Sequence, residues 1–341
     1  MQDFSNHGGR LGAAMRRFPH APTPWIDLST GINPVAYPAP LASAEARARL
    51  PEPEALAALE AAAARAFGLP PEMVLATAGG EAAIRLLAAV IPASRVGVAE
   101  PAYGGHRQSW TEAGATVVGV SRQDLAGAVL DLEVLAVVNP NNPDGAVTPP
   151  EALAALAEVM GAWGGWLIVD EAFVEVAPEL SVATLAGHAS HRIWPAPRLI
   201  ALRSFGKFYG LAGLRLGFVT GHPVLIARLR RRQGDWPVSA DALAAGWAAY
   251  ADAAWAEATR TRLAEDARRL DDLLQRAGFK IVGGCDLFRL AAADDAAARF
   301  VRLAEAGILT RPFDAAPRWL RFGLPAPDQW PRLQALLEEL S

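Results

Sequence analysis

Residues 202–218 read LRSFGKFYGLAGLRLGF, and this stretch decides how the rest of the chain is interpreted. It places an amine (Lys207), a hydroxyl (Ser204) and a guanidinium (Arg215) around a short turn rich in glycine. A lysine amine can form a Schiff base with an aldehyde, and a serine and an arginine beside it can hold a phosphate. The combination indicates pyridoxal 5'-phosphate (PLP), an aldehyde phosphate that enzymes use as an electron sink on amino acids.

The composition is that of a folded, helix-rich protein. The chain has 341 residues, 52% of them hydrophobic and 20% charged, and this length favours two domains. A formal net charge of −4 argues against nucleic acid as the main partner. The single cysteine, Cys285, excludes an intrachain disulfide and a cysteine metal cluster, and we expect no metal in the site. The sequence shows neither a signal peptide nor an apolar run long enough to span a membrane, so we expect the cytoplasm.

Helical and strand-like segments alternate from about residue 54, which favours an α/β fold with a mostly parallel sheet. The segments that read as its strands are 73–77, 95–99, 116–120, 135–139, 167–170 and 199–204. After about residue 237 a long helical region, 240–277, precedes fewer strands, which indicates a smaller α+β domain. We therefore expect a large PLP-binding domain over 46–236, and a small domain formed by 1–45 and 237–341.

Two of the predicted strands end in groups that can bind an anion or an oxygen. Gly79 and Gly80, followed by Glu81, open a helix and expose backbone N–H groups at its positive end, although a plain tight turn explains this motif equally well. Asn142 lies in the run NPNNPDG, and its amide can donate to a phenolate oxygen such as the 3'-oxygen of PLP. Asn-Pro and Asp-Gly pairs are also ordinary turn formers.

Two further strands end in charged residues. Asp170 closes the apolar run 167–170, and a buried carboxylate there needs a cationic partner, which a protonated pyridine nitrogen supplies. The alternative is a surface carboxylate that caps the next segment. Lys207, desolvated beside Arg203 and Arg215, is expected to have a lowered amine pKa that favours nucleophilic attack; the alternative is a solvent-exposed loop lysine.

The four elements occur in chain order at 79–81, 142, 170 and 207, with Arg215 eight residues after the lysine. Because the carboxyl ends of parallel strands meet at one edge of a sheet, where ligands bind, we expect these residues to converge. Each is ambiguous by itself, and their combination predicts a PLP site.

This order and spacing resemble the fold-type I PLP enzymes, the aspartate aminotransferase superfamily. The resemblance covers nearly the whole chain and implies a large domain with a mostly parallel, mixed seven-stranded sheet, a smaller α+β domain and a homodimer. Within the superfamily, the chain is most similar to the branch of histidinol-phosphate aminotransferases and threonine-phosphate decarboxylases. His7-Gly-Gly9, the segment DLSTGINP at 27–34 and the segment DEAF at 170–173 favour the decarboxylases of cobalamin biosynthesis.

The resemblance also implies roles for individual residues. Lys207 binds the cofactor covalently, Asp170 pairs with the pyridine nitrogen, and either Tyr103 or His106 stacks on the ring. The cofactor-binding residues implied are Gly79, Gly80, Glu81 (through its backbone), Tyr103, His106, Asn142, Asp170, Ser204, Lys207 and Arg215. For the substrate, Arg321 matches the arginine that grips the α-carboxylate, and our candidates for its phosphate are His7, Arg10 and Asn33.

The chain departs from the pattern of its relatives in two places. Relatives that transaminate usually carry tyrosine where this chain has Phe173, which cannot donate to the 3'-oxygen. Leu50-Pro51 stands where a Tyr-Pro pair of the neighbouring subunit reaches the cofactor phosphate, so that contact from the partner is in doubt.

The expected reaction is the decarboxylation of L-threonine O-3-phosphate to (R)-1-amino-2-propanol O-2-phosphate. The alternative is an aminotransferase that acts on a phosphorylated amino alcohol such as histidinol phosphate, with the same residues. A binding protein with this fold but no catalysis is a third interpretation, against which stand the retained Lys207 and Asp170. The partners expected are the small phosphorylated substrate and a second copy of the chain, with neither nucleic acid nor membrane.

Overall fold

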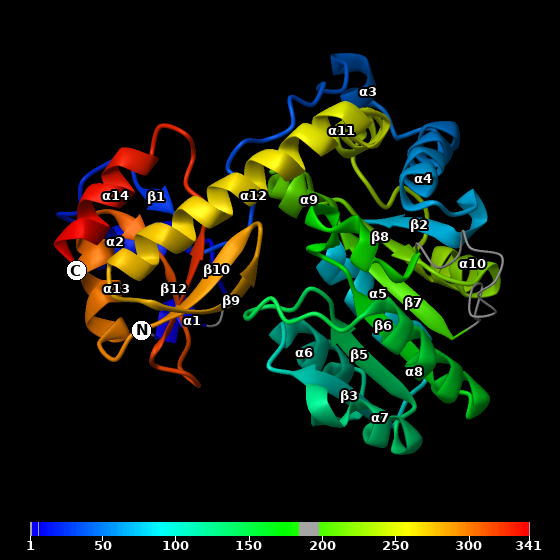
Figure 1. Cartoon of the computed structure of the whole chain (residues 1–341). Coiled ribbons are helices and arrows are strands. Elements are labelled where there is room, and N and C mark those ends of the chain that lie inside the picture. The colour runs from blue at the N-terminus through cyan, green and yellow to red at the C-terminus, as the bar shows by residue number, and fades with distance from the viewer. Residues whose placement is uncertain (1, 6, 184–197, 341) are drawn as a thin grey trace. The chain divides into compact units, whose positions relative to one another are not determined.

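The computed structural model describes residues 2–5, 7–183 and 198–340, which form two compact units (Figure 1). The large unit contains Tyr37–Asn142 and Val147–Ala256. The small unit contains the residues up to Ala36, the short loop Pro143–Ala146 and the residues from Glu257 onward. None of the described helices is both long and apolar enough to cross a membrane.

A seven-stranded sheet forms the centre of the large unit, as the resemblance implied (Figure 1). Its strands are β2 (Val74–Thr77), β3 (Arg95–Glu100), β4 (Thr116–Ser121), β5 (Val134–Val138), β6 (Trp166–Asp170), β7 (Leu199–Ser204) and β8 (Gly217–Thr220). They lie in the order β2-β8-β7-β6-β5-β3-β4, with β8 antiparallel to both of its neighbours and the other pairs parallel. Strand β5 is an apolar run buried along its whole length, and β7 is buried from Leu199 to Arg203, which is typical of a sheet covered on both faces.

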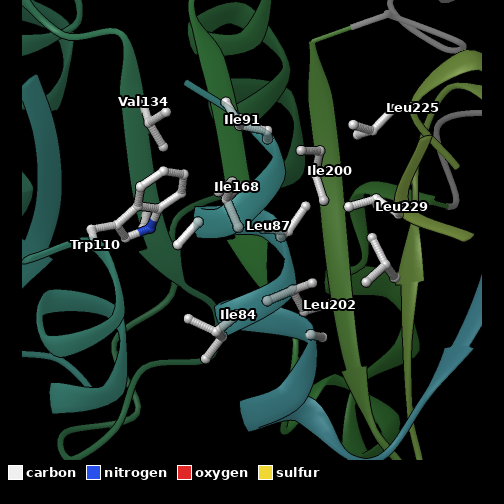
Figure 2. Packing of buried hydrophobic residues seen from close by; sticks show 14 of the residues in the cluster. Ile84, Leu87, Ile91, Trp110, Val134, Ile168, Ile200, Leu202, Leu225 and Leu229 are labelled. Carbon is white, nitrogen blue, oxygen red and sulfur yellow. The ribbon is translucent and has the colours of Figure 1, made fainter. Parts of the chain in front are cut away.

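Helices surround this sheet, and several of them pack against it and complete its core. The helices of the large unit are α3 (Ala44–Ala48), α4 (Pro53–Phe67), α5 (Gly80–Val90), α6 (Gly104–Glu112), α7 (Leu125–Ala128), α8 (Pro150–Ala162), α9 (Phe205–Phe208), α10 (Pro223–Gln233) and α11 (Ala240–Ala251). Ile84, Leu87 and Ile91 recur at helical spacing on one face of α5 and pack against strand residues such as Ile200 and Leu202 (Figure 2). This packing fixes the N-terminus of α5 beside the ends of the strands.

The small unit is built on a four-stranded antiparallel sheet of order β12-β13-β10-β9. Its strands are β9 (Lys280–Cys285), β10 (Phe288–Ala292), β12 (Arg311–Pro312) and β13 (Trp319–Gly323), and a separate pair joins β1 (Ile26–Asp27) to β11 (Ile308–Leu309). The helices are α1 (Gln2–Ser5), α2 (Leu11–Arg17), α12 (Ala253–Arg276), which begins in the large unit, α13 (Ala296–Glu305) and α14 (Trp330–Glu339). Phe288, Phe300 and Phe322 are fully buried in its core.

The boundaries between the two units differ from the expected ones at residues 46 and 236. The first lies after Ala36 and the last lies after Ala256, and the loop Pro143–Ala146 adds two more. Helix α11 belongs to the large unit because it packs against α4, so closely that a Cβ on Gly246 would lie 2.7 Å from Leu59 Cδ1. The expected helical region 240–277 is divided at Asp252, whose Oδ1 accepts a hydrogen bond from the Trp255 N–H at 2.9 Å and starts α12.

Candidate active site

The ends of β5, β6 and β7 meet at one edge of the large sheet. Asp170, the last residue of β6, pairs in register with Val138 of β5 and with Leu202 of β7. The segment from Asn139 to Asn142 follows β5 directly, and Ser204 closes β7. The polar residues predicted from the sequence therefore gather at the carboxyl edge of a parallel sheet, where α/β proteins bind ligands.

Asp170 is buried at the tip of its strand and is held on both oxygens. Its Oδ2 lies 2.9 Å from His106 Nε2, and its Oδ1 accepts a hydrogen bond from the Ala172 N–H at 3.1 Å. His106 lies on the first turn of α6, and its side chain is also buried. The Nε2 atom of His106 faces Asp170, and an Nε2–H that donates to Asp170 stabilises its carboxylate.

Tyr103 precedes α6 and is held differently. Its hydroxyl donates to Glu81 Oε2 at 3.0 Å, and its ring lies against Gly105, where a side chain would collide with it. The carboxylate of Glu81 also accepts a bond from Arg85 Nε at 3.0 Å. Because its side chain is engaged in these two bonds, Glu81 offers the start of α5 its backbone N–H alone.

Four residues converge at the N-terminus of α5. A Cβ on Gly79 would lie 2.7 Å from Arg215 Nη2, and a Cβ on Gly80 would lie 2.6 Å from Ser204 Oγ. Gly79 also has a φ of +94°, a backbone conformation that other residues rarely adopt. Glycine is therefore required at both positions, because a guanidinium and a hydroxyl approach the helix end where side chains would otherwise stand. Backbone N–H groups, a hydroxyl and a cation together form an oxyanion cradle that fits the phosphate of PLP.

Lys207 lies on the short helix α9 and is half-buried. Its Nζ is 5.7 Å from the centre of the Phe173 ring, within the range of a cation–π contact. Phe173 lies three residues after Asp170 and is buried, so the amine and the segment after β6 occupy the same region.

The side chain of Arg203, which we expected near Lys207, is engaged by two carboxylates. It contacts Glu171 and Glu175 at 2.9 Å and 3.0 Å, and all three side chains are buried. Arg215, in contrast, belongs to the cradle at the N-terminus of α5.

The loop after β5 is a turn that side-chain hydrogen bonds hold in place. The side chain of Asn139 donates to Thr148 O at 3.1 Å and accepts from its N–H at 2.8 Å, which closes the loop. Asn141 Nδ2 donates to Pro101 O at 2.7 Å. These bonds fix the backbone on one side of Asn142, whose side chain is buried.

In the small unit, Arg321 and the N-terminal segment lie together. Arg321 is buried on β13, and its Nη2 donates to Ser29 O at 2.8 Å. The Ser29 hydroxyl accepts from the Gly9 N–H at 2.7 Å, and Gly8 packs on the Ser29 backbone. The side chains of His7 and Arg10 are exposed, on either side of this contact.

Asn33 is buried and its amide is oriented. Its Oδ1 accepts bonds from the Val35 N–H at 3.0 Å and from Arg262 Nη2 at 2.7 Å. An amide whose oxygen is engaged in this way can offer a ligand only its NH2 group.

Arg311 is a residue whose role the sequence reasoning missed. It pairs in register with Arg321 across β12 and β13. Burial, together with the like charge of Arg311, lowers the pKa of Arg321 to about 9. Two arginines that face each other in this way favour an anionic ligand. A signal was present in the sequence, because Arg311 comes shortly after the apolar pair Ile308-Leu309, which is typical of a strand.

Comparisons with known proteins agree with this geometry. Residues 23–338 match the sequence profile of the family described as aminotransferase class I and II. Threonine-phosphate decarboxylases from Pseudomonas aeruginosa and from a Sinorhizobium species are each 41% identical to the chain; they cover 97% and 94% of it, and 96% and 93% of their own length is matched. Histidinol-phosphate aminotransferases match at 27% to 33% identity. The histidinol-phosphate aminotransferase of Sinorhizobium meliloti, solved with PLP, superposes with a TM-score of 0.83 at 21% identity, over 96% of this chain and 94% of that one.

Proposed function

The chain belongs to the aminotransferase class I and II family, and we propose that it removes the carboxyl group of L-threonine O-3-phosphate as CO2. The products are CO2 and (R)-1-amino-2-propanol O-2-phosphate, an intermediate of cobalamin biosynthesis. The observation that carries this choice is the identity of 41% to two threonine-phosphate decarboxylases along nearly the whole chain.

PLP is the cofactor, and when bound it supplies an electron sink for the bond that breaks at the substrate α-carbon. The cradle of Gly79, Gly80, Ser204 and Arg215 would hold its phosphate, and Asn142 would donate to its 3'-oxygen. Lys207 would bind its aldehyde carbon through Nζ. The close approach of Arg215 to Gly79 and of Ser204 to Gly80 supports the cradle, and Lys207 follows Ser204 by three residues.

Asp170 is our candidate for the partner of the pyridine nitrogen, because an ionised carboxylate there keeps that nitrogen protonated. His106 would hold this carboxylate in place through the bond of 2.9 Å. Tyr103 is our choice for the ring that stacks on the cofactor, because its bond of 3.0 Å to Glu81 holds it beside the N-terminus of α5, where the cradle lies.

On the substrate side, we assign the α-carboxylate to Arg321, with Arg311 opposite it, and the phosphate to His7, Arg10 and Asn33. The pair of facing arginines and the oriented amide of Asn33 support this assignment. Phosphate binding at a distance from the breaking bond would use binding energy to orient the carboxylate for departure. After CO2 leaves, Lys207 Nζ is the group that we expect to return a proton to the α-carbon.

We expect the chain to act in the cytoplasm as a homodimer. A groove of about 650 Å³ on the large unit runs between α3, α4 and α11, and apolar side chains dominate its lining. Leu50 and Trp247 in this groove are 63% and 52% exposed. Large exposed apolar residues that cluster in this way mark protein–protein contacts, and light scattering on the purified protein tests the assembly.

One assay separates decarboxylation from transamination. Purified protein with PLP is incubated with L-threonine O-3-phosphate, and the CO2 released is measured. We expect many molecules of CO2 for each bound cofactor, and no conversion of the cofactor to pyridoxamine phosphate. Formation of pyridoxamine phosphate with histidinol phosphate, without CO2 from threonine phosphate, would favour the aminotransferase instead.

A further inference from the structure

A buried network of charged side chains lies directly behind the site, in the large unit. Arg203 Nη1 donates to Glu175 Oε1 at 3.0 Å and Nη2 donates to Ser181 Oγ at 2.7 Å. Its Nε lies 2.9 Å from Glu171 Oε2. Ser181 in turn donates to Glu171 at 2.9 Å, and the Phe67 ring lies 4.6 Å from the guanidinium carbon.

This network begins where the pairing of two strands ends. The register of β6 with β7 stops at Asp170 and Leu202, and the last backbone bond runs from the Glu171 N–H to Leu202 O at 2.9 Å. Glu171 is the residue after Asp170, and Arg203 is the residue before Ser204. The network therefore connects the two chain segments that carry the site, immediately beyond the last bond of the sheet.

The network also folds the segment after β6 back on itself. Glu171 Oε1 accepts from the Val182 N–H at 2.7 Å, while Glu175 reaches Arg203 from the intervening 3-10 turn. Phe173, whose ring faces Lys207 Nζ, lies inside the closed segment. Movement of these bonds would shift both Asp170 and Phe173 relative to the lysine.

Stability alone does not explain such a cluster. Replacing a buried ion pair by apolar residues of similar volume is often neutral or stabilising, because desolvation offsets the attraction. Burial raises the pKa of Glu171, which the charge of Arg203 lowers only in part. A cluster with two carboxylates around one guanidinium thus carries an electrostatic cost.

We propose that Arg203, with Glu171 and Glu175, is a positioning network that sets the place of Asp170 and Phe173 relative to Lys207. The inference rests on the roles proposed above for Asp170 and Lys207. Arg203 touches neither cofactor nor substrate in this account, and it acts by fixing the residues that do.

The test compares Arg203→Lys with the wild-type holoenzyme. Lysine keeps the charge but loses the planar fork that reaches three partners. We expect kcat to fall roughly 10- to 100-fold, as a small misplacement of reacting groups does. KM should stay within about threefold, since the substrate residues lie outside the network. In the absence of substrate, the midpoint of the visible absorbance titration of the bound cofactor should move by about half a pH unit or more.

A matched control and a second variant keep the test decisive. Arg289→Lys alters an Arg–Asp pair of the small unit, in which Arg289 Nε lies 2.8 Å from Asp271, and it should leave both the titration midpoint and kcat unchanged. Glu175→Gln is nearly isosteric and should shift the midpoint even if Arg203→Lys does not fold. Lowered thermal stability with wild-type midpoint and kcat in both variants would overturn the proposal. A wild-type protein without cofactor absorbance would instead contradict the proposed function.

Discussion

Two buried arginines, one in each unit, are used in different ways. Arg203 on β7 and Arg321 on β13 are 4% and 3% exposed. The charges of Glu171 and Glu175 outweigh the effect of burial and raise the pKa of Arg203, whereas burial and Arg311 lower that of Arg321. The comparison teaches that a buried charge balanced by the protein holds structure, while one placed opposite a like charge is suited to an external anion.

The largest effect on stability is expected when the cation that balances Glu171 and Glu175 is removed. Arg203→Met leaves two buried carboxylates without their cation, and the free energy of unfolding should fall by about 3–5 kcal/mol. Urea unfolding of the holoenzyme measures this loss of unfolding free energy. If Arg321→Gln destabilised the protein as much as Arg203→Met does, the distinction between the two arginines would be lost.

Arg321→Gln should instead act on the substrate. Loss of a buried partner for a carboxylate costs about 2–5 kcal/mol, so kcat/KM for threonine phosphate should fall by a factor of roughly 30 to 5,000. Cofactor absorbance should be unchanged, because Arg321 belongs to the small unit. Steady-state kinetics and a visible spectrum provide both readings, and a near-normal kcat/KM would contradict the assignment.

An added anion should sharpen the same contrast. Acetate, a simple carboxylate, at 100 times its Kd should stabilise the wild-type holoenzyme by about 2.7 kcal/mol, because it relieves the repulsion between Arg311 and Arg321. The shift in melting temperature should disappear in Arg321→Gln and persist in Arg203→Lys. Equal shifts in wild type and Arg321→Gln would place the anion elsewhere.

The smallest expected effect is a pH dependence. Since the pKa of Glu171 is raised on folding, the folded protein binds a proton more readily there, and this contribution to stability is lost as pH rises above the unfolded value. Relative to Glu171→Gln, the free energy of unfolding of the wild type should therefore fall by up to about 1.4 kcal/mol per pH unit. This fall is expected between the unfolded and the folded pKa of Glu171. Parallel stability curves for the two proteins between pH 4 and 7 (roughly the range of a raised carboxyl pKa) would contradict this.

The sequence predicted the sheet and the converging strand ends because long apolar runs and turn motifs are local signals. It missed β8, which has only four residues and adjoins the glycine-rich turn. The seventh strand was expected from the resemblance alone. The pairing of His106 with Asp170 depends on how α6 packs against the strands, which no local pattern specifies.

The position of Arg203 could have been predicted more closely. Side chains alternate across a strand, and Ile200, Leu202 and Ser204 all face α5 (Figure 2 shows the first two). Arg203 must therefore point to the opposite face, away from the cradle. Its carboxylate partners, in contrast, depend on the fold of the segment after β6 and were not readable from spacing.

The covalent attachment of the cofactor is the claim on which the rest depends, and the composition makes it easy to test. The chain contains two lysines, Lys207 and Lys280, and Lys280 is exposed at the start of β9 in the small unit. The holoprotein is reduced with borohydride, digested and analysed by mass spectrometry, with Lys207→Ala and Lys280→Ala treated in parallel. We predict the pyridoxyl adduct on Lys207 in wild type and in Lys280→Ala, and none in Lys207→Ala. An adduct on Lys280, or none in the wild type, would contradict the account.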